Sequence, residues 1–148
     1  MLTDLQYGYA RQVLATGEAL GITPLGIQIA FAVVFVETAW RNLANPNDPE
    51  SQSFPNDGLS YDTNSDGLFQ QRAPWWGSAE CRMTPSCAAT LFFNALKRFT
   101  YNSGYQTPGT YAQDVQDSAY PDRYDAVFPE AVALYNQLKG IGNDAVLP

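Results

Sequence analysis

The sequence has no histidine, only two cysteines and few positive charges. Without histidine, Ser-His-Asp and Cys-His catalysis and imidazole-ligated metal sites are excluded. Two cysteines are too few for a zinc site built from four cysteines, and without histidine they cannot form a mixed cysteine and histidine site. The 8 Lys and Arg are scattered and are outnumbered by 15 Asp and Glu, for a net charge of −7, which argues against a nucleic-acid partner. Any catalysis must therefore use carboxylates, hydroxyls, amides or a hard cation.

Long apolar runs are also missing. The longest, Leu25 to Val36, has 12 residues and includes Gln28, whereas a membrane span needs roughly 20. We interpret this run as a buried helix and expect no membrane partner. The N-terminal residues are polar and amphipathic, so we expect no signal peptide within the chain. Export would then use another route or a segment that precedes this sequence.

The length of 148 residues predicts one domain, 1–148, and helix signals dominate it. Thr3 with Gln6 forms a capping-box pattern, and Thr-Pro pairs at 23–24 and 84–85 place a cap before a proline that tolerates the first helical position. We also expect Thr110 to cap a short helix and Gly140 to end the last one. The predicted helices cover approximately 3–17, 23–40, 84–99, 110–119 and 129–139.

A polar segment of about 40 residues separates the second and third predicted helices, and loops of that length are usually functional. Residues 59–63 are the one stretch expected to pair briefly as a β-hairpin. The predicted fold class is therefore mostly α, with a long, mostly irregular loop. After this loop, Cys81 and Cys87 enclose five residues including Pro85, a spacing that permits a disulfide. The alternative is two free thiols, whereas a bridge indicates an oxidising environment outside the cell.

Glu37 is the most informative single residue, because it lies near the end of an otherwise apolar predicted helix. Burial there would raise its pKa and favour the protonated form. A protonated carboxylic acid is what cleavage of a glycosidic bond requires, since the leaving oxygen must receive a proton. The alternative is that Glu37 faces solvent or pairs with Arg41, four residues later on the same helix.

Several motifs around Glu37 resemble a known superfamily. Residues 37–42, Glu-Thr-Ala-Trp-Arg-Asn, resemble the first motif of lytic transglycosylases and goose-type lysozymes, and 67–70, Gly-Leu-Phe-Gln, resemble the second. Over about residues 31–124 the chain is similar to lysozyme-like domains of actinobacterial phages. These domains share Asn-Pro-Glu-Ser-like and Asp-Gly stretches, Gly-Leu-Phe-Gln-Gln-Arg, a Trp-Gly pair and a late Ser-Ala-Tyr-Pro segment.

The resemblance implies a lysozyme-like helical domain in which the long loop forms the active site and Glu37 is the general acid and base. Gly67 would let the backbone approach the sugar, and Gln70 would hydrogen-bond an acetamido or hydroxyl group. Tyr120 would be the late aromatic residue near the acid. Gln71, Trp75 and Trp76 complete the expected substrate-binding residues. Trp75 and Trp76, with Tyr61 and Phe69, offer stacking surfaces for sugar rings, with core packing as the alternative, whereas Trp40 is expected in the core.

This chain departs from the superfamily pattern in two ways. The stretch between Glu37 and Gly67 is longer than in typical soluble transglycosylases, and Asp66 directly precedes Gly67, where a small residue is expected. Asp57, Asp62 and Asp66 are therefore candidates for a second catalytic carboxylate, which would favour hydrolysis.

Residues 62–67 also match the first half of an EF-hand loop, with Asp62, Asn64 and Asp66 as potential Ca²⁺ ligands. Position 12 of that loop is Ala73 instead of the bidentate Glu, which excludes a full EF-hand. The alternatives are a weaker Ca²⁺ site or a cluster of Asx turns. No other cofactor is expected.

The resemblance implies cleavage of the MurNAc–GlcNAc bond of bacterial peptidoglycan by a lytic transglycosylase or lysozyme. Such a domain would act at the bacterial cell wall, as a phage-encoded protein tethered within a larger lysin or tail protein. One alternative is a non-catalytic wall-binding or tail structural module with the same fold. Another is an interaction domain stabilised by Ca²⁺.

Overall fold

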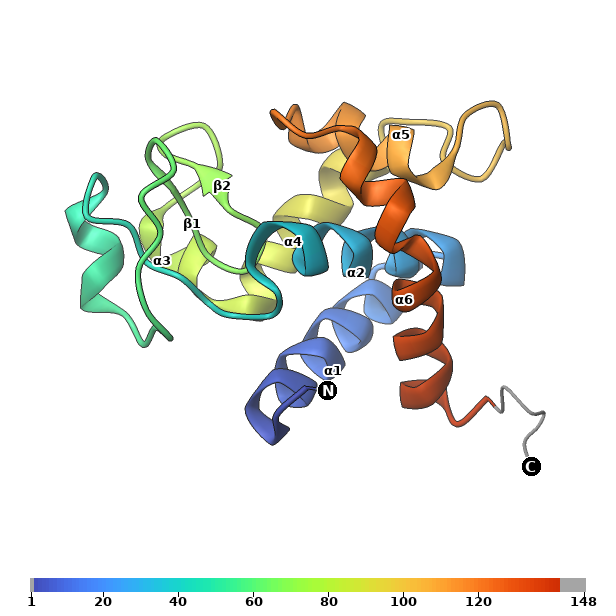
Figure 1. Cartoon of the computed structure of the whole chain (residues 1–148), viewed down its shortest axis with the longest axis horizontal. Coiled ribbons are helices and arrows are strands. Elements are labelled where there is room, and N and C mark those ends of the chain that lie inside the picture. Colours follow the sequence, from blue (N-terminus) through green and yellow to red (C-terminus); the bar gives the residue numbers. More distant parts are fainter. Residues whose placement is uncertain (1, 142–148) are drawn as a thin grey trace.

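The computed structural model describes residues 2–141, and the fold is mostly helical, as predicted (Figure 1). In chain order its elements are α1 (Asp4–Ala19), α2 (Pro24–Thr38), the 3-10 helix η1 (Pro49–Ser53), β1 (Ser65–Asp66), β2 (Gln71–Arg72), α3 (Ala79–Met83), α4 (Pro85–Leu96), α5 (Pro108–Gln116) and α6 (Asp122–Lys139).

Helix α2 is the centre of the fold and packs against α1, α4, α5 and α6. Its residues Ile29, Phe31, Val33 and Val34 are fully buried. This burial on several faces explains the continuous apolar run, which is the interior of a helical domain. Among residues 2–141 there is no helix long and apolar enough to span a bilayer.

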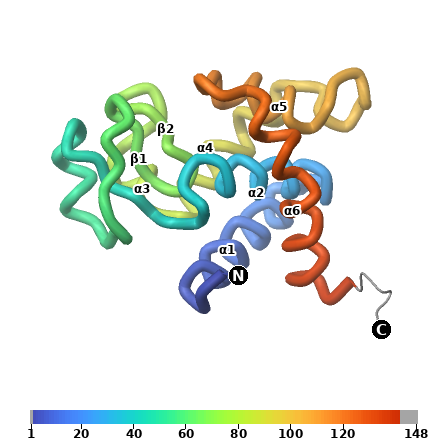
Figure 2. The backbone as a smooth tube through the Cα atoms, viewed as in Figure 1, coloured from blue at the N-terminus to red at the C-terminus, as the bar shows by residue number. Residues whose placement is uncertain are grey.

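The irregular segment between α2 and α4 forms a separate lobe at the C-terminal end of α2, whereas α5 and α6 lie on the other side of that end (Figure 2). The lobe contains η1, the two strands and α3. Strands β1 and β2 pair antiparallel with Ser65 opposite Arg72. The hairpin therefore exists, but a few residues after the predicted 59–63. Leu59 makes only an isolated bridge to Ala44.

Local capping signals predicted three helix starts and one helix end correctly. Thr3 Oγ1 accepts the Gln6 backbone N–H, and the Gln6 side chain accepts the Thr3 N–H, which completes the capping box. The Thr-Pro pairs at 23–24 and 84–85 open α2 and α4, but only the Thr23 side chain caps its helix, whereas Thr84 donates its hydroxyl to the Glu80 carbonyl. Gly140 ends α6 with a left-handed backbone, a conformation that glycine adopts without steric cost.

Two predicted helix starts are wrong. Thr110 lies inside α5, which is capped by Thr107 in a third Thr-Pro pair. Helix α6 begins at Asp122, about two turns before the predicted start at Pro129. Pro129 is an exposed position within this helix, and the buried Tyr124 and Ala131 hold α6 to the core on both sides of it. Tertiary packing therefore overrides a proline that by itself favours a helix start. The short helix α3 was not predicted.

Cys81 and Cys87 are joined in a disulfide that links α3 to α4, so the alternative of two free thiols is wrong. On the chain-entropy model, so short a loop stabilises the fold by about 2 kcal/mol. Reduction is expected to lower the melting temperature of the parent and to leave a Cys81→Ser/Cys87→Ser variant unchanged. Thermal melting with and without reductant tests this, together with an intact mass two hydrogens below that of the dithiol. An equal response of parent and variant to reductant would contradict it.

Candidate active site

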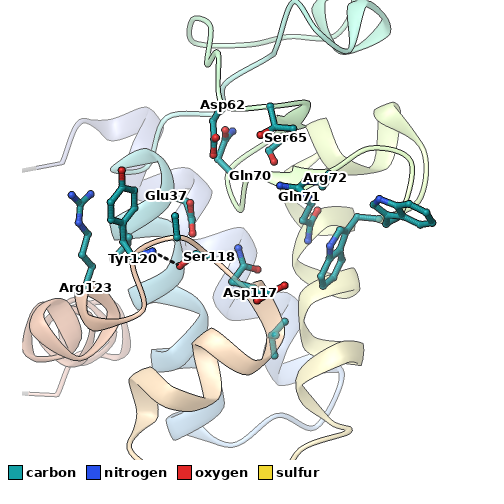
Figure 3. Close-up of a pocket in the computed structure, with 17 residues that line it drawn as sticks. Glu37, Asp62, Ser65, Gln70, Gln71, Arg72, Asp117, Ser118, Tyr120 and Arg123 are labelled. Carbon is teal, nitrogen blue, oxygen red and sulfur yellow. Dashed lines mark hydrogen bonds between the residues drawn. The ribbon is translucent and has the colours of Figure 1, made fainter.

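A cleft of about 750 Å³ opens between the irregular lobe and the segment that joins α5 to α6 (Figure 3). The last turn of α2 forms part of its lining, and residues from β1, β2, α5 and α6 complete it. The lining residues are Val36, Glu37, Asp62, Thr63, Ser65, Gln70, Gln71, Arg72, Trp75, Trp76, Val115, Gln116, Asp117, Ser118, Ala119, Tyr120 and Arg123.

Glu37 lies in this cleft, and its carboxylate accepts a hydrogen bond of 2.5 Å from the Tyr124 hydroxyl. Burial raises the pKa of Glu37, and the negative charge of Asp62 acts in the same direction. The hydrogen bond from Tyr124, the neighbouring Gln116 amide and the positive charge of Arg123 oppose this shift because they favour the ionised form. Arg41 is exposed and donates through Nε to the Thr38 carbonyl, so the alternative Glu37–Arg41 pair does not form.

The position of Glu37 is fixed by the way α2 ends. Thr38 donates its hydroxyl to the Leu68 carbonyl at 2.9 Å, which ties the helix end to the turn between β1 and β2. Trp40 is fully buried, as predicted, and contacts the rings of Phe31 and Phe35 edge-to-face. The helix end that carries the carboxylate is therefore held by a hydrogen bond to the irregular lobe and by the packing of Trp40 in the core.

Unusual backbone conformations gather at the same place. Within residues 2–141, five non-glycine residues have positive φ. Thr63, Gln70 and Asp117 line the cleft, while Ala39 and Trp40 directly follow the helix that carries Glu37. Such conformations cost energy and concentrate at functional sites. This clustering is an indication of function that does not depend on any sequence motif.

Most of the predicted substrate-binding residues line the cleft. Trp75 is 78% exposed and Tyr120 is 57% exposed, so both offer ring surface to a ligand. Trp76 is half-buried. Gln70 turns its amide back to the Gly67 carbonyl, and Gln71 is buried and donates to the Ala88 carbonyl of α4.

Gly67 does not line the cleft, contrary to the prediction. A Cβ at this position would lie 2.0 Å from the carbonyl oxygen of Arg82, and the residue has a φ of +82°. The glycine is thus needed for close backbone packing between β1 and α3. Phe69 is also misassigned as a stacking surface, because it is fully buried against Phe92. Tyr61 is exposed but is not a lining residue.

The three candidates for a second carboxylate are in different environments. Asp62 lines the cleft and acts electrostatically on Glu37. Asp57 accepts hydrogen bonds from the Tyr9 hydroxyl and the Asn42 backbone and does not line the cleft. Asp66 is fully buried and paired with Arg82. Asp62 is therefore the one of the three that is placed to act with Glu37.

The predicted Ca²⁺ ligands do not converge. Asp66 faces Arg82, and Asn64 donates its amide to the Ala73 carbonyl. The carbonyls of Asp62, Thr63 and Ser65 all accept from the Asn45 side-chain amide instead. Across the described part of the chain, no group of three or more Cys, Asp or Glu is arranged to hold a metal. Side-chain hydrogen bonds to the backbone organise this loop.

Arg82 connects three segments of the irregular lobe. Its buried guanidinium donates to Asp66 of β1 and Asp48 before η1, both at 2.8 Å, and to the carbonyls of Trp76 and Gly77. Burial and a hydrogen bond with Asp48 raise the pKa of Asp66 to about 7. The sequence offered no signal for this network, because Arg82 is far along the chain from both acids.

Two residues that contact Glu37, Tyr124 and Gln116, were not predicted. Tyr120 was expected to be the aromatic residue near the acid, but the one that hydrogen-bonds to it is Tyr124, one helical turn later. Tyr120, which was assigned from the resemblance of residues 118–121 to the superfamily, lines the same cleft as Glu37. Tyr120 instead lies under the guanidinium of Arg123, at 4.1 Å from the ring centroid.

Comparison of the sequence with known protein families and with curated proteins finds no match. The function must therefore be argued from the cleft itself.

Removing the Tyr124 hydroxyl tests its influence on Glu37. The hydrogen bond stabilises the ionised carboxylate, so Tyr124→Phe should raise the pKa of Glu37 further. If Glu37 works as a general acid, the alkaline limb of the pH profile of its reaction, where the acid loses its proton, is expected to move to higher pH. Tyr135→Phe, at another buried tyrosine of α6, is the matched control and should leave the profile in place. An unmoved limb in Tyr124→Phe would contradict this role.

Proposed function

We propose that this chain cleaves the MurNAc–GlcNAc β-1,4 bond of peptidoglycan, with Glu37 as the general acid and base. The observation that carries the proposal is the placement of Glu37: a half-buried carboxyl with a raised pKa, facing a cleft large enough for sugar rings. The exposed rings of Trp75 and Tyr120 in the same cleft suit the C–H faces of sugars. The motif resemblance is independent support, as is the absence of histidine.

In the first step, protonated Glu37 gives its proton to the glycosidic oxygen while the bond to the anomeric carbon breaks. The resulting positive charge on the sugar is stabilised by the Glu37 carboxylate that remains. Tyr124 assists here, because its hydrogen bond favours the ionised form of Glu37.

The second step has two routes. In a transglycosylase, the Glu37 carboxylate takes the proton of the MurNAc C6 hydroxyl, whose oxygen bonds to the anomeric carbon and closes a 1,6-anhydro ring. In a hydrolase, a carboxylate takes a proton from water, whose oxygen bonds to the anomeric carbon, and Asp62 and Asp117 are the other acids that line the cleft. In the first route the proton returns to Glu37, and in the second it goes to the carboxylate that activates the water. Either route leaves the original glycosidic bond broken.

Mass spectrometry of purified peptidoglycan after digestion tests the proposal. Anhydro-muropeptides would identify a transglycosylase, and products with a reducing MurNAc end would identify a lysozyme. Sedimentation of the protein with insoluble peptidoglycan gives a separate readout of binding. Binding without any soluble product would overturn the proposal in favour of a non-catalytic wall-binding module.

A further inference from the structure

Two arginines of the cleft form no ion pair among residues 2–141, although the positive charge of Arg123 acts on Glu37 from a distance. Of the chain's 8 Lys and Arg, Arg82 and Lys139 form ion pairs, and the remaining cations are not paired within the part of the chain described. Arg72 and Arg123 belong to this unpaired set, are exposed, and line the cleft. An exposed arginine alone is ordinary, so the argument depends on where these two lie.

Figure 3 shows Arg123 beside Tyr120 on one side of Glu37, and Arg72 beside Gln71 on the other. The stack on Tyr120 orients the Arg123 guanidinium. Arg72 is held in β2 by pairing with Ser65, on the wall that also carries Trp75 and Trp76. Each side of the acid therefore combines an aromatic surface with an unpaired guanidinium.

This arrangement matters because the chain as a whole has a charge of −7 and would repel an anionic polymer. Inside the cleft, by contrast, the lining includes two guanidiniums beside the carboxyl groups of Glu37, Asp62 and Asp117. Guanidinium groups bind carboxylates in a planar, two-bond geometry. A neutral glycan would offer no carboxylate to either guanidinium.

We propose that Arg72 and Arg123 select glycans that carry carboxylates on the 3-O-lactyl substituent of the sugar over neutral N-acetylglucosamine polymers. The inference rests on the proposed function, since it assigns specificity to the same cleft. The carboxylate has two sources: the free lactyl group of a strand without peptides, or the stem peptide attached to it.

Binding is measured in the Glu37→Gln background, so that no probe is cleaved, by titration calorimetry at low salt. The probes are a tetramer of N-acetylglucosamine, a peptidoglycan tetrasaccharide with free lactyl groups, and the same tetrasaccharide with its peptides. Arg72→Gln, Arg123→Gln and the double variant each remove positive charge from the cleft. Arg98→Gln makes the same change at an exposed position outside the cleft.

The Glu37→Gln protein with both arginines intact is expected to bind at least one carboxylate probe about tenfold more tightly than the neutral tetramer, an effect of the size of one charge-assisted contact. Either single arginine variant should reduce this preference and the double variant should abolish it, while Arg98→Gln retains it. Preference for the free lactyl probe would assign the contact to that carboxylate. Preference only for the peptide-bearing probe would assign it to the stem.

Unchanged preference in the double variant would overturn the inference, as would an equal loss of affinity for the neutral tetramer. The two proposals can fail separately. Cleavage by the parent combined with unchanged preference in the double variant removes only the arginine role. A carboxylate preference that depends on the two arginines, in a chain that cleaves nothing, removes only the proposed enzymatic function.

Discussion

The Glu37→Gln variant is expected to lose cleavage of peptidoglycan by about 10²- to 10⁴-fold, the usual effect of removing general acid–base catalysis. The change is nearly isosteric and keeps a group that can accept from Tyr124, so the cleft should retain its shape. Binding to insoluble peptidoglycan should persist, because Trp75 and Tyr120 are untouched. Release of soluble muropeptides and sedimentation with the wall measure the two effects separately.

The same variant should be at least as stable as the parent at neutral pH. Because folding raises the pKa of Glu37, this carboxyl contributes stability below its unfolded pKa and loses that contribution as the pH rises through the folded pKa. Glutamine does not titrate, so the melting temperature of the variant relative to the parent should increase with pH from about 4 upward. Glu130→Gln, at an exposed site on α6, is the matched control and should show neither effect. Full activity of Glu37→Gln would remove the proposed role of this residue.

The helix starts and the disulfide that were predicted correctly each depend on residues close together in the chain. The capping box at Thr3 and two Thr-Pro pairs act within one helical turn, and Cys81 and Cys87 are close enough that a bridge is the natural outcome. Glu37 stood out because a single acid interrupts an apolar run, a contrast visible without any structure. Its presence in the cleft agrees with that reading.

What the sequence could not predict depends on contacts between distant residues. Tyr124 is 87 positions from Glu37, and its identity as the partner depends on the true start of α6. Gly67 and Asp66 looked functional in the motif, yet both contact Arg82 and hold the lobe together. A motif states that a residue type is needed at a position, but it does not distinguish a role in folding from one in binding.

The Arg82→Met variant is expected to be destabilised by about 3–5 kcal/mol, the cost of removing one partner from a buried ion pair. Asp66 would remain buried without its cation, and the carbonyls of Trp76 and Gly77 would lose a donor. For a domain of this size each kcal/mol lowers the melting temperature by roughly 2–4 °C. Arg41→Met removes an exposed arginine of the same size and should change the melting temperature little.

The pH dependence of that loss identifies its cause. Below pH 7 Asp66 is largely protonated in both folded proteins, so the missing guanidinium matters least there. The stability gap between parent and Arg82→Met should widen as the pH rises through and above 7, the value to which the pKa of Asp66 is raised in the parent. Adding Asp66→Asn to Arg82→Met removes the uncompensated charge and should recover part of the stability, with a flatter pH dependence. Melting curves of the parent, the single variant and the double variant at pH values below and above 7 test this, because that range brackets the pKa of Asp66 in the parent. A gap that is constant with pH would mean that Arg82 stabilises the lobe through its packing and its bonds to the carbonyls, without an electrostatic contribution from Asp66.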